Sequence, residues 1–222
     1  MNSTKFSAII FDLDGVIADT ARFHFMAWQQ LAADLGIDLP AITEHRLKGL
    51  ERMASLDIIL AQTPESYTES QKLALASKKN DHYCHLIETL SPKHLLAGAG
   101  QLLAQLSGQG IPVALASASK NAAAVIARLG IADYFTYIAD ANRVKQPKPH
   151  PEIFLMAAAG LGFPPSACLA IEDAAAGVES INRAGIYSVG VGDRKELAHA
   201  NEVIHDLTDF CLDKHFKLEG VT

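Results

Sequence analysis

Apolar runs and helical patterns alternate along the second half of the chain. Buried strands are expected at residues 111–116, 136–139, 168–171 and 187–191, and helices at residues 99–107, 121–129, 151–161 and 175–184. Gly130, Gly162 and Gly185 stand where three of these helices should end. A further apolar run at residues 8–11 is typical of a buried parallel strand. The alternation predicts an α/β fold with a doubly wound parallel sheet.

Residues 20–88 interrupt this alternation, because they contain helical patterns and almost no β-branched runs. His24, Trp28, Leu31 and Leu35 fall on one helical face, and a long helix is expected at residues 67–90. The pattern predicts an inserted α-helical cap domain over the carboxyl edge of the sheet. The predicted boundaries are 18–91 for the cap and 1–17 plus 92–222 for the core. Near the carboxyl terminus, residues 206–216 are expected to form a helix.

Two acidic residues follow the first apolar run at a strand's carboxyl end, in the stretch Phe11-Asp12-Leu13-Asp14-Gly15. Open α/β sheets bind ligands at this edge. Two neighbouring carboxylates are costly unless a cation or a shared proton offsets their repulsion. We therefore expect a metal-assisted site in which one carboxylate acts as a nucleophile. The alternative is a solvated turn, since Asp and Gly are common in turns.

A second polar stretch, Ser117-Ala118-Ser119-Lys120-Asn121, joins an expected strand to the start of a helix. Helix amino termini present free N–H groups, which suit a phosphate, and Ser117 is expected to donate one more hydrogen bond. The alternative is ordinary helix capping by Ser119 or Asn121.

Two further stretches complete the candidate chemistry. Lys148 lies between two prolines, and a lysine on such a stiff loop suits pairing with both Asp12 and a phosphate. For the nearby Lys145, a solvated position is favoured. Glu172 and Asp173 end an apolar strand, and with Asp12 they offer oxygen ligands suited to Mg²⁺. Capping of the next helix by Asp173 is compatible with metal binding.

Composition limits the remaining possibilities. The chain has 222 residues and a formal net charge of −6, which disfavours non-specific nucleic-acid binding. No apolar run is long enough to span a membrane, and the polar residues 1–6 do not suggest a secretory leader. Three widely spaced cysteines are expected to be unpaired, as in the reducing cytoplasm, with Cys168 in the core.

These four stretches, in this order, resemble the haloacid dehalogenase-like (HAD) superfamily of phosphotransferases, over nearly the whole chain. The resemblance implies a Rossmann-like core in which Asp12 becomes an aspartyl phosphate and Asp14 is the general acid/base. It also implies that Ser117 binds phosphate and that Lys148 steadies the nucleophile and the phosphate. The implied cofactor is Mg²⁺, held by Asp12, the backbone carbonyl of Asp14, Glu172 and Asp173.

The implied roles agree with the charges involved. A phosphate dianion repels an attacking carboxylate, so Mg²⁺, Lys148 and backbone N–H groups must offset that repulsion. Asp14 must hold a proton near neutral pH, far above its reference pKa of about 3.9. A closed, dry site with acidic neighbours is expected to raise the pKa of Asp14.

Stretches of the cap resemble one phosphomutase branch of this superfamily, whose members interconvert β-D-glucose 1-phosphate and D-glucose 6-phosphate through β-glucose 1,6-bisphosphate. The resemblance implies that Arg52 binds the idle phosphate, that Lys79 contacts the sugar and that His24 positions Asp14. The implied substrate- and phosphate-binding residues are Thr20, His24, Trp28, Leu47, Lys48, Gly49, Arg52, Lys79, Ser117, Ala118, Ser119, Lys120, Asn121 and Lys148.

A mutase must bind two phosphates, and the planar fork of Arg52 suits the one that is not transferred. Read without the resemblance, Arg46, Lys48 and Arg52 are more simply a solvated face of a cap helix. We expect a monomeric phosphomutase that acts on a small sugar phosphate. The alternatives are a phosphatase of the same superfamily, acting on a hexose phosphate or phosphoglycolate, and a non-catalytic sugar-phosphate sensor.

Overall fold

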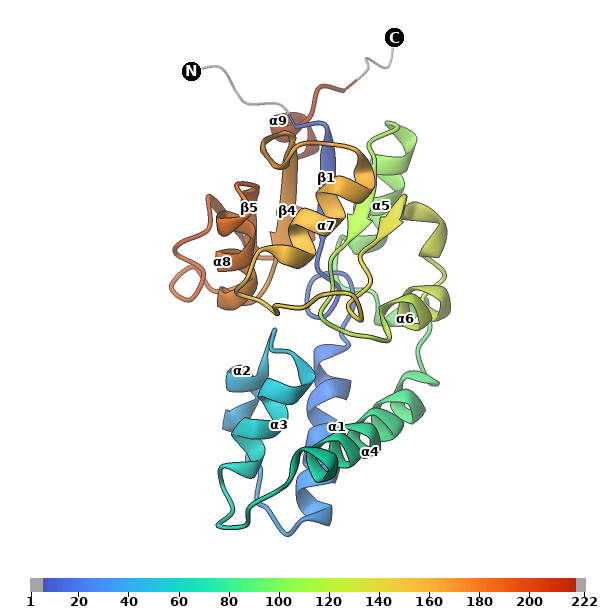
Figure 1. Ribbon diagram of the computed structural model, residues 1–222. Coiled ribbons are helices and arrows are strands. Elements are labelled where there is room, and N and C mark those ends of the chain that lie inside the picture. Colours follow the sequence, from blue (N-terminus) through green and yellow to red (C-terminus); the bar gives the residue numbers. More distant parts are fainter. Residues whose placement is uncertain (1–5, 219–222) are drawn as a thin grey trace.

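A six-stranded parallel sheet forms the centre of the computed structural model, which describes residues 6–218 (Figure 1). The strand order is β3-β2-β1-β4-β5-β6, and every strand pair is parallel. The strands are β1 (Ala8–Phe11), β2 (Val113–Leu115), β3 (Tyr137–Ile138), β4 (Cys168–Glu172), β5 (Tyr187–Val191) and β6 (Glu202–Ile204). The predicted doubly wound α/β architecture is therefore confirmed.

Helices cover both faces of the sheet because side chains alternate along each strand. Ile9 and Phe11 face one apolar cluster, which includes residues of α5 and α6, while Ala8 and Ile10 face another, which includes residues of α7 and α8. The core helices are α5 (Ala99–Gly108), α6 (Ala122–Arg128), α7 (Glu152–Leu161), α8 (Ala175–Arg183) and α9 (Leu212–His215). Short 3₁₀ helices within residues 6–218 are η1 (Ala41–Thr43), η2 (Pro92–His94), η3 (Ala132–Tyr134), η4 (Pro165–Ala167) and η5 (Leu207–Asp209).

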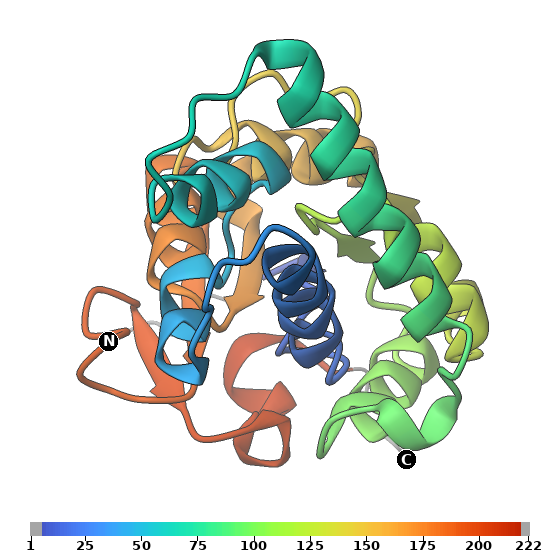
Figure 2. The same cartoon turned by 90° about the horizontal axis from the view of Figure 1, so that it is seen from below.

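The inserted helical segment, residues 18–91 and called the cap below, lies at the carboxyl edge of the sheet (Figure 1). Its helices are α1 (Ala21–Asp34), α2 (Glu44–Leu47), α3 (Arg52–Leu60) and α4 (Glu69–Ile87). Viewed from the cap side, α1 lies near the centre and α4 runs along one side (Figure 2). A separate apolar cluster holds the cap together, with Trp28, Leu31 and Ile59 among its buried members.

The two chain segments that join the cap to the core pair with each other. Ala18 and Leu95 form an antiparallel bridge, and the backbone N–H of Leu96 donates to the carbonyl of Ile17 at 2.9 Å. The two connecting segments therefore lie side by side, and the first of them follows the acidic stretch Asp12-Leu13-Asp14 closely in the sequence. The boundaries 18–91 remain a prediction.

The carboxyl-terminal part of the chain differs from expectation. The helix predicted at 206–216 is wrong, because this stretch forms η5 and the single turn α9. Leu207, Phe210, Leu212 and Phe216 all enter the core, and their irregular spacing does not fit one continuous helix. The edge strand β6 was not predicted, since only Val203 and Ile204 are apolar in it.

Several smaller predictions are confirmed. Gly130, Gly162 and Gly185 have positive φ values of 70°, 79° and 72° after α6, α7 and α8. Cys168 is buried, and all three cysteines are free. Within residues 6–218, no helix has the length and apolar character needed to cross a membrane. The expectation about a secretory leader concerns residues that lie largely outside the described range.

Candidate active site

Three buried carboxylates meet at the carboxyl edge of the sheet. Asp12 directly follows β1, while Glu172 ends β4 and Asp173 follows it, and β1 and β4 are neighbours with Phe11 opposite Ile171. One oxygen of each carboxylate lies within 4.8 Å of the others. The register of two adjacent strands therefore creates the acidic cluster that the sequence predicts.

Crowding and burial change the proton affinity of these groups. Burial and the charge of Glu172 raise the pKa of Asp12 to about 8, although Lys148 acts in the opposite direction. Burial likewise raises the pKa of Asp173 to about 6, against the lowering effect of Lys48. The nearby lysines do not fully offset the repulsion among the three carboxylates. The carboxylate oxygens are hard donors, which fit Mg²⁺.

Lys148 supplies part of the missing positive charge. Its Nζ donates to Oδ1 of Asp12 at 2.7 Å and to Oε2 of Glu172 at 2.8 Å, in a fully buried arrangement. The other oxygen of Glu172, Oε1, accepts from the backbone N–H groups of Asp173 and Ala174. The pairing of Lys148 with Asp12 agrees with the sequence interpretation, whereas its second carboxylate partner was not foreseen. Lys145 is exposed, as predicted.

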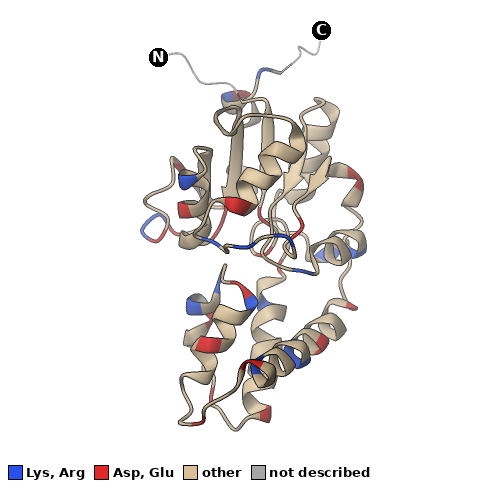
Figure 3. Cartoon of the chain, viewed as in Figure 1, with Lys and Arg blue, Asp and Glu red and all other residues tan. Residues whose placement is uncertain are grey.

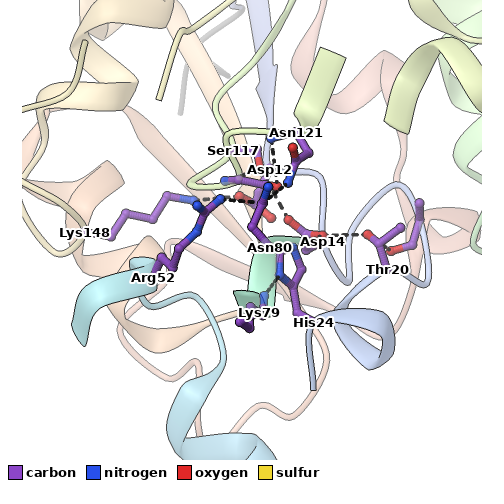
Figure 4. A network of polar contacts seen from close by, with 12 residues as sticks. Asp12, Asp14, Thr20, His24, Arg52, Lys79, Asn80, Ser117, Asn121 and Lys148 are labelled. Carbon is purple, nitrogen blue, oxygen red and sulfur yellow. Dashed lines mark hydrogen bonds and ion pairs between the residues drawn. The ribbon is translucent and has the colours of Figure 1, made fainter. Parts of the chain in front are cut away.

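Asp14 lies in a different electrostatic environment from Asp12. Its carboxylate accepts from Thr20 Oγ1 at 2.6 Å and from Ser117 Oγ at 3.3 Å, and His24 Nε2 lies 3.5 Å away (Figure 4). Burial favours the neutral acid, but His24 and the two hydroxyl donors outweigh it and lower the pKa of Asp14 to about 2. The expected rise in the pKa of Asp14 is therefore wrong for this arrangement.

The polar stretch after β2 contributes hydroxyl groups rather than a side-chain helix cap. Ser117 Oγ accepts from the N–H of Ser119 at 3.0 Å, and its own proton is directed to Asp14. Asn121 occupies the N-cap position of α6 but makes no side-chain cap hydrogen bond. The Ser119 hydroxyl accepts from the N–H of Asn121 at 3.3 Å. At the other strand end, Ala174 rather than Asp173 is the N-cap of α8.

Lys79 of the cap contacts the ring nitrogen of His24 that faces away from Asp14. Lys79 Nζ lies 2.8 Å from Nδ1 of His24, and it lies over the rings of Trp28 and Tyr83 at 4.7 and 5.0 Å. The His24 ring stacks on Tyr83 with 3.9 Å between centroids. A protonated Lys79 is only a donor, so it requires Nδ1 of His24 to accept and leaves Nε2 to carry the proton toward Asp14. Burial, followed by the charge of Arg52, lowers the pKa of Lys79 to about 7.

Two more basic residues of the cap have polar partners at the same opening. Lys48 Nζ forms an ion pair with Oδ2 of Asp173 in the core at 2.8 Å, whereas Arg52 Nη2 donates to Oδ1 of Asn80, which belongs to the cap, at 2.7 Å. Blue and red segments meet where the cap faces the sheet edge (Figure 3). Lys48 and Arg52 both line the cavity between cap and core. The simpler interpretation as a solvated helix face is therefore wrong for Arg52, whereas Arg46 and Lys48 are exposed.

A cavity of about 590 Å³ lies between the cap and the core. The predicted site residues that line it are Asp12, Asp14, His24, Trp28, Leu47, Lys48, Gly49, Arg52, Lys79, Ala118, Ser119, Lys120, Lys148 and Asp173. The other predicted residues contact this lining: Thr20 and Ser117 bind Asp14, and Glu172 binds Lys148. Asn121 reaches it through Asn80, to which it donates at 2.9 Å. The volume of the cavity suits a small polar metabolite.

Several residues of this site were not predicted. Phe25, Leu50 and Glu51 are among those that line the cavity, and Asn80 and Tyr83 belong to the polar network behind it. Asn80 follows Lys79 directly, and Tyr83 lies one helical turn beyond Lys79 on α4. For Tyr83, the i+4 spacing from Lys79 was the available signal, whereas the spacing of Asn80 gave none. Neither residue type suggests a ligand by itself, which is why the pattern did not single them out.

Together, the buried carboxylates, the lysine at the sheet edge and the helical cap define a capped α/β enzyme. A family model described as a haloacid dehalogenase-like hydrolase matches residues 6–185, and the chain belongs to this family. It is 44% identical to the β-phosphoglucomutase of Bacillus subtilis, over 93% of this chain and 92% of the relative.

Solved structures and a second relative extend the comparison. The fold matches a crystal structure of β-phosphoglucomutase from Clostridium difficile with a TM-score of 0.90 and 45% identity, covering 94% of each chain. A fructose-1-phosphate phosphatase of Escherichia coli K12 is 30% identical over 84% of this chain and 97% of the relative. Both mutases and phosphatases are therefore among the similar proteins.

Proposed function

We propose that this chain is a phosphomutase that interconverts β-D-glucose 1-phosphate and D-glucose 6-phosphate through an aspartyl phosphate at Asp12 and β-glucose 1,6-bisphosphate. The observation that carries the proposal is the placement of Arg52 in the same cavity as Asp12. A mutase needs a second cationic group for the phosphate that is not being transferred. Similarity to β-phosphoglucomutases over nearly the full chain supports the same conclusion.

Phosphoryl transfer places separate demands on the two aspartates. An oxygen of Asp12 forms a bond to phosphorus as the bond from phosphorus to the sugar oxygen breaks, and that sugar oxygen takes a proton from Asp14. In the other half of the cycle a sugar hydroxyl gives its proton to Asp14 and takes the phosphoryl group from Asp12. The ionised state of Asp14 in this arrangement suits the second half, in which it acts as a base.

Lys148 holds Asp12 in place through the 2.7 Å contact to its Oδ1, and its charge favours the ionised carboxylate against the effects of burial and Glu172 on the pKa. Mg²⁺ is the cofactor that we propose, held by Asp12 and Asp173 with the backbone carbonyl of Asp14 and the carboxylate of Glu172. When bound, Mg²⁺ offsets the repulsion between a phosphate dianion and the attacking carboxylate. His24 orients Asp14, and closure of the cap over the bound substrate would exclude water, which otherwise accepts the phosphoryl group.

We also propose that the protein works as a monomer on small sugar phosphates, without nucleic-acid or membrane partners. Its net charge of −6 supports this view for nucleic acid. The three unpaired cysteines support a cytoplasmic location.

The test is turnover of β-D-glucose 1-phosphate in Mg²⁺ buffer with a trace of β-glucose 1,6-bisphosphate. Rapid formation of glucose 6-phosphate is expected, and release of inorganic phosphate at a comparable rate would instead identify a phosphatase. Asp12→Asn is expected to lose at least about 10⁴-fold in kcat, since it removes the nucleophile. A sensor would keep its ligand response in that variant but would show no wild-type turnover.

A further inference from the structure

One side chain outside the predicted site joins both parts of the molecule. Asn80 Oδ1 accepts from Nη2 of Arg52 at 2.7 Å and from Nδ2 of Asn121 at 2.9 Å (Figure 4). Arg52 begins α3 and Asn80 belongs to α4, so both are cap residues, whereas Asn121 precedes α6 in the core. A single amide oxygen therefore fixes two cap helices and the core relative to one another.

The neutral character of this acceptor affects what Arg52 can bind. Among residues 6–218, no carboxylate forms an ion pair with Arg52, and Glu51 and Asp81 act on it only from longer range. Burial lowers the pKa of Arg52, against the opposing effect of Glu51. An amide orients the guanidinium through one hydrogen bond and leaves its charge available to an anion in the cavity.

We infer that Asn80 is a positioning residue, which aims Arg52 into the cavity and couples the binding of a second phosphate there to the contact between the cap and Asn121 of the core. The inference rests on the proposed function for the identity of that phosphate. Asn80 does not itself line the cavity, so it acts through Arg52. A purely structural role for Asn80 would instead affect all activities of the enzyme equally.

Two substitutions separate these roles. Asn80→Ala removes the acceptor, and Asn80→Asp replaces it with a carboxylate that pairs with Arg52 and neutralises it. The KM for β-D-glucose 1-phosphate is expected to rise about tenfold in Asn80→Ala, since a hydrogen bond to a charged group is lost. A larger rise is expected in Asn80→Asp. Hydrolysis of acetyl phosphate, which brings no second phosphate, should fall much less, so the ratio of the two activities changes.

The matched control is Ser77→Asp, which adds the same charge to an exposed position one turn earlier on α4. Its KM for the sugar phosphate should stay close to the wild-type value. An unchanged KM in both Asn80 variants, or equal losses with both phosphoryl donors, would overturn the inference.

A binding measurement keeps this test independent of the proposed reaction. Trp28 is the only tryptophan of the chain and lines the cavity, so its fluorescence can report the binding of D-glucose 6-phosphate. If wild-type turnover fails but binding weakens about tenfold in Asn80→Ala, the proposed function is wrong and the role of Asn80 stands. If turnover occurs but the Asn80 variants bind as tightly as the wild type, the role of Asn80 is wrong and the function stands.

Discussion

Lys48 of the cap and Asp173 of the core form an ion pair, with 2.8 Å between Nζ and Oδ2. Asp173 is buried, whereas the Lys48 side chain remains 38% exposed. The ammonium group thus reaches from the cap loop to a carboxylate of the proposed Mg²⁺ site. A lysine and a divalent cation that share one carboxylate compete for it, because each weakens the attraction of the other.

Lys48→Ala is therefore expected to tighten Mg²⁺ binding. The pair is partly exposed, so the gain is modest, about two- to fivefold in the dissociation constant. Calorimetric titration of the metal-free protein with Mg²⁺ measures this directly. Lys48→Arg keeps the charge and should bind Mg²⁺ like the wild type. Weaker Mg²⁺ binding in Lys48→Ala would show that this lysine assists the site instead.

Gly49, the residue after Lys48, controls how closely the cap loop approaches the core. Gly49 has a φ of 72°, and a Cβ atom added there would lie 2.8 Å from Cβ of Ala174 at the start of α8. Gly49→Ala must therefore push the loop away and lengthen the Lys48 contact. We expect its KM for the sugar phosphate to rise about tenfold or more, as measured by steady-state kinetics.

Gly36→Ala is the matched control for this substitution. Gly36 is also in the cap and has a φ of 70°, but an added Cβ would meet no atom within 4 Å. Both variants share the cost of placing alanine in a left-handed conformation, about 1 kcal/mol of stability. A similar KM in the two variants would mean that contact with Ala174 does not matter for substrate binding.

Sequence patterns predicted the sheet edge better than the cap. Asp12, Lys148 and Asp173 follow directly from strand ends and a stiff loop, because adjacent parallel strands deliver their carboxyl ends to one place. The partners of a charged cap residue depend on how two helices and a loop pack. The link from Arg52 to Asn80 joins residues on different cap helices, and no periodicity within either helix specifies it.

The electrostatic prediction for Asp14 was wrong for a related reason. Acidic neighbours and burial both favour a protonated carboxyl, and the sequence led us to expect both at Asp14. The outcome depends on three donors, of which Thr20 and His24 begin the cap and Ser117 follows β2. Their convergence on one carboxylate is a property of the folded chain, and it reverses the direction of the pKa shift.

Lys148 is expected to contribute strongly to stability. In Lys148→Ala, the carboxylates of Asp12 and Glu172 stay buried without their shared ammonium group. Removing one partner of a buried pair costs about 3–5 kcal/mol, so a loss of that order is expected in the free energy of unfolding without Mg²⁺. Urea denaturation with and without Mg²⁺ provides the measurement, and Mg²⁺ should reduce the loss.

An exposed ion pair of the same length serves as the comparison. Lys72 Nζ lies 2.7 Å from Oδ1 of Asp57, but the Asp57 side chain is 56% exposed. Lys72→Ala should cost far less stability than Lys148→Ala, because solvent screens the pair. Equal losses in the two variants would contradict the idea that burial of the Lys148 cluster determines its importance.

Lys79 is expected to make stability depend on pH. Burial lowers its pKa from the ordinary 10.5 to about 7 in the folded chain. Between these two values the unfolded chain holds a proton that the folded chain lacks, so the free energy of unfolding rises with pH across this window. Lys79→Met removes the titrating group but keeps an unbranched side chain. Urea denaturation from pH 7 to pH 10 should therefore show the wild type gaining stability relative to Lys79→Met. Parallel curves for the two proteins would mean that the folded chain keeps Lys79 charged throughout, as firm pairing of the ammonium with an anionic group would require.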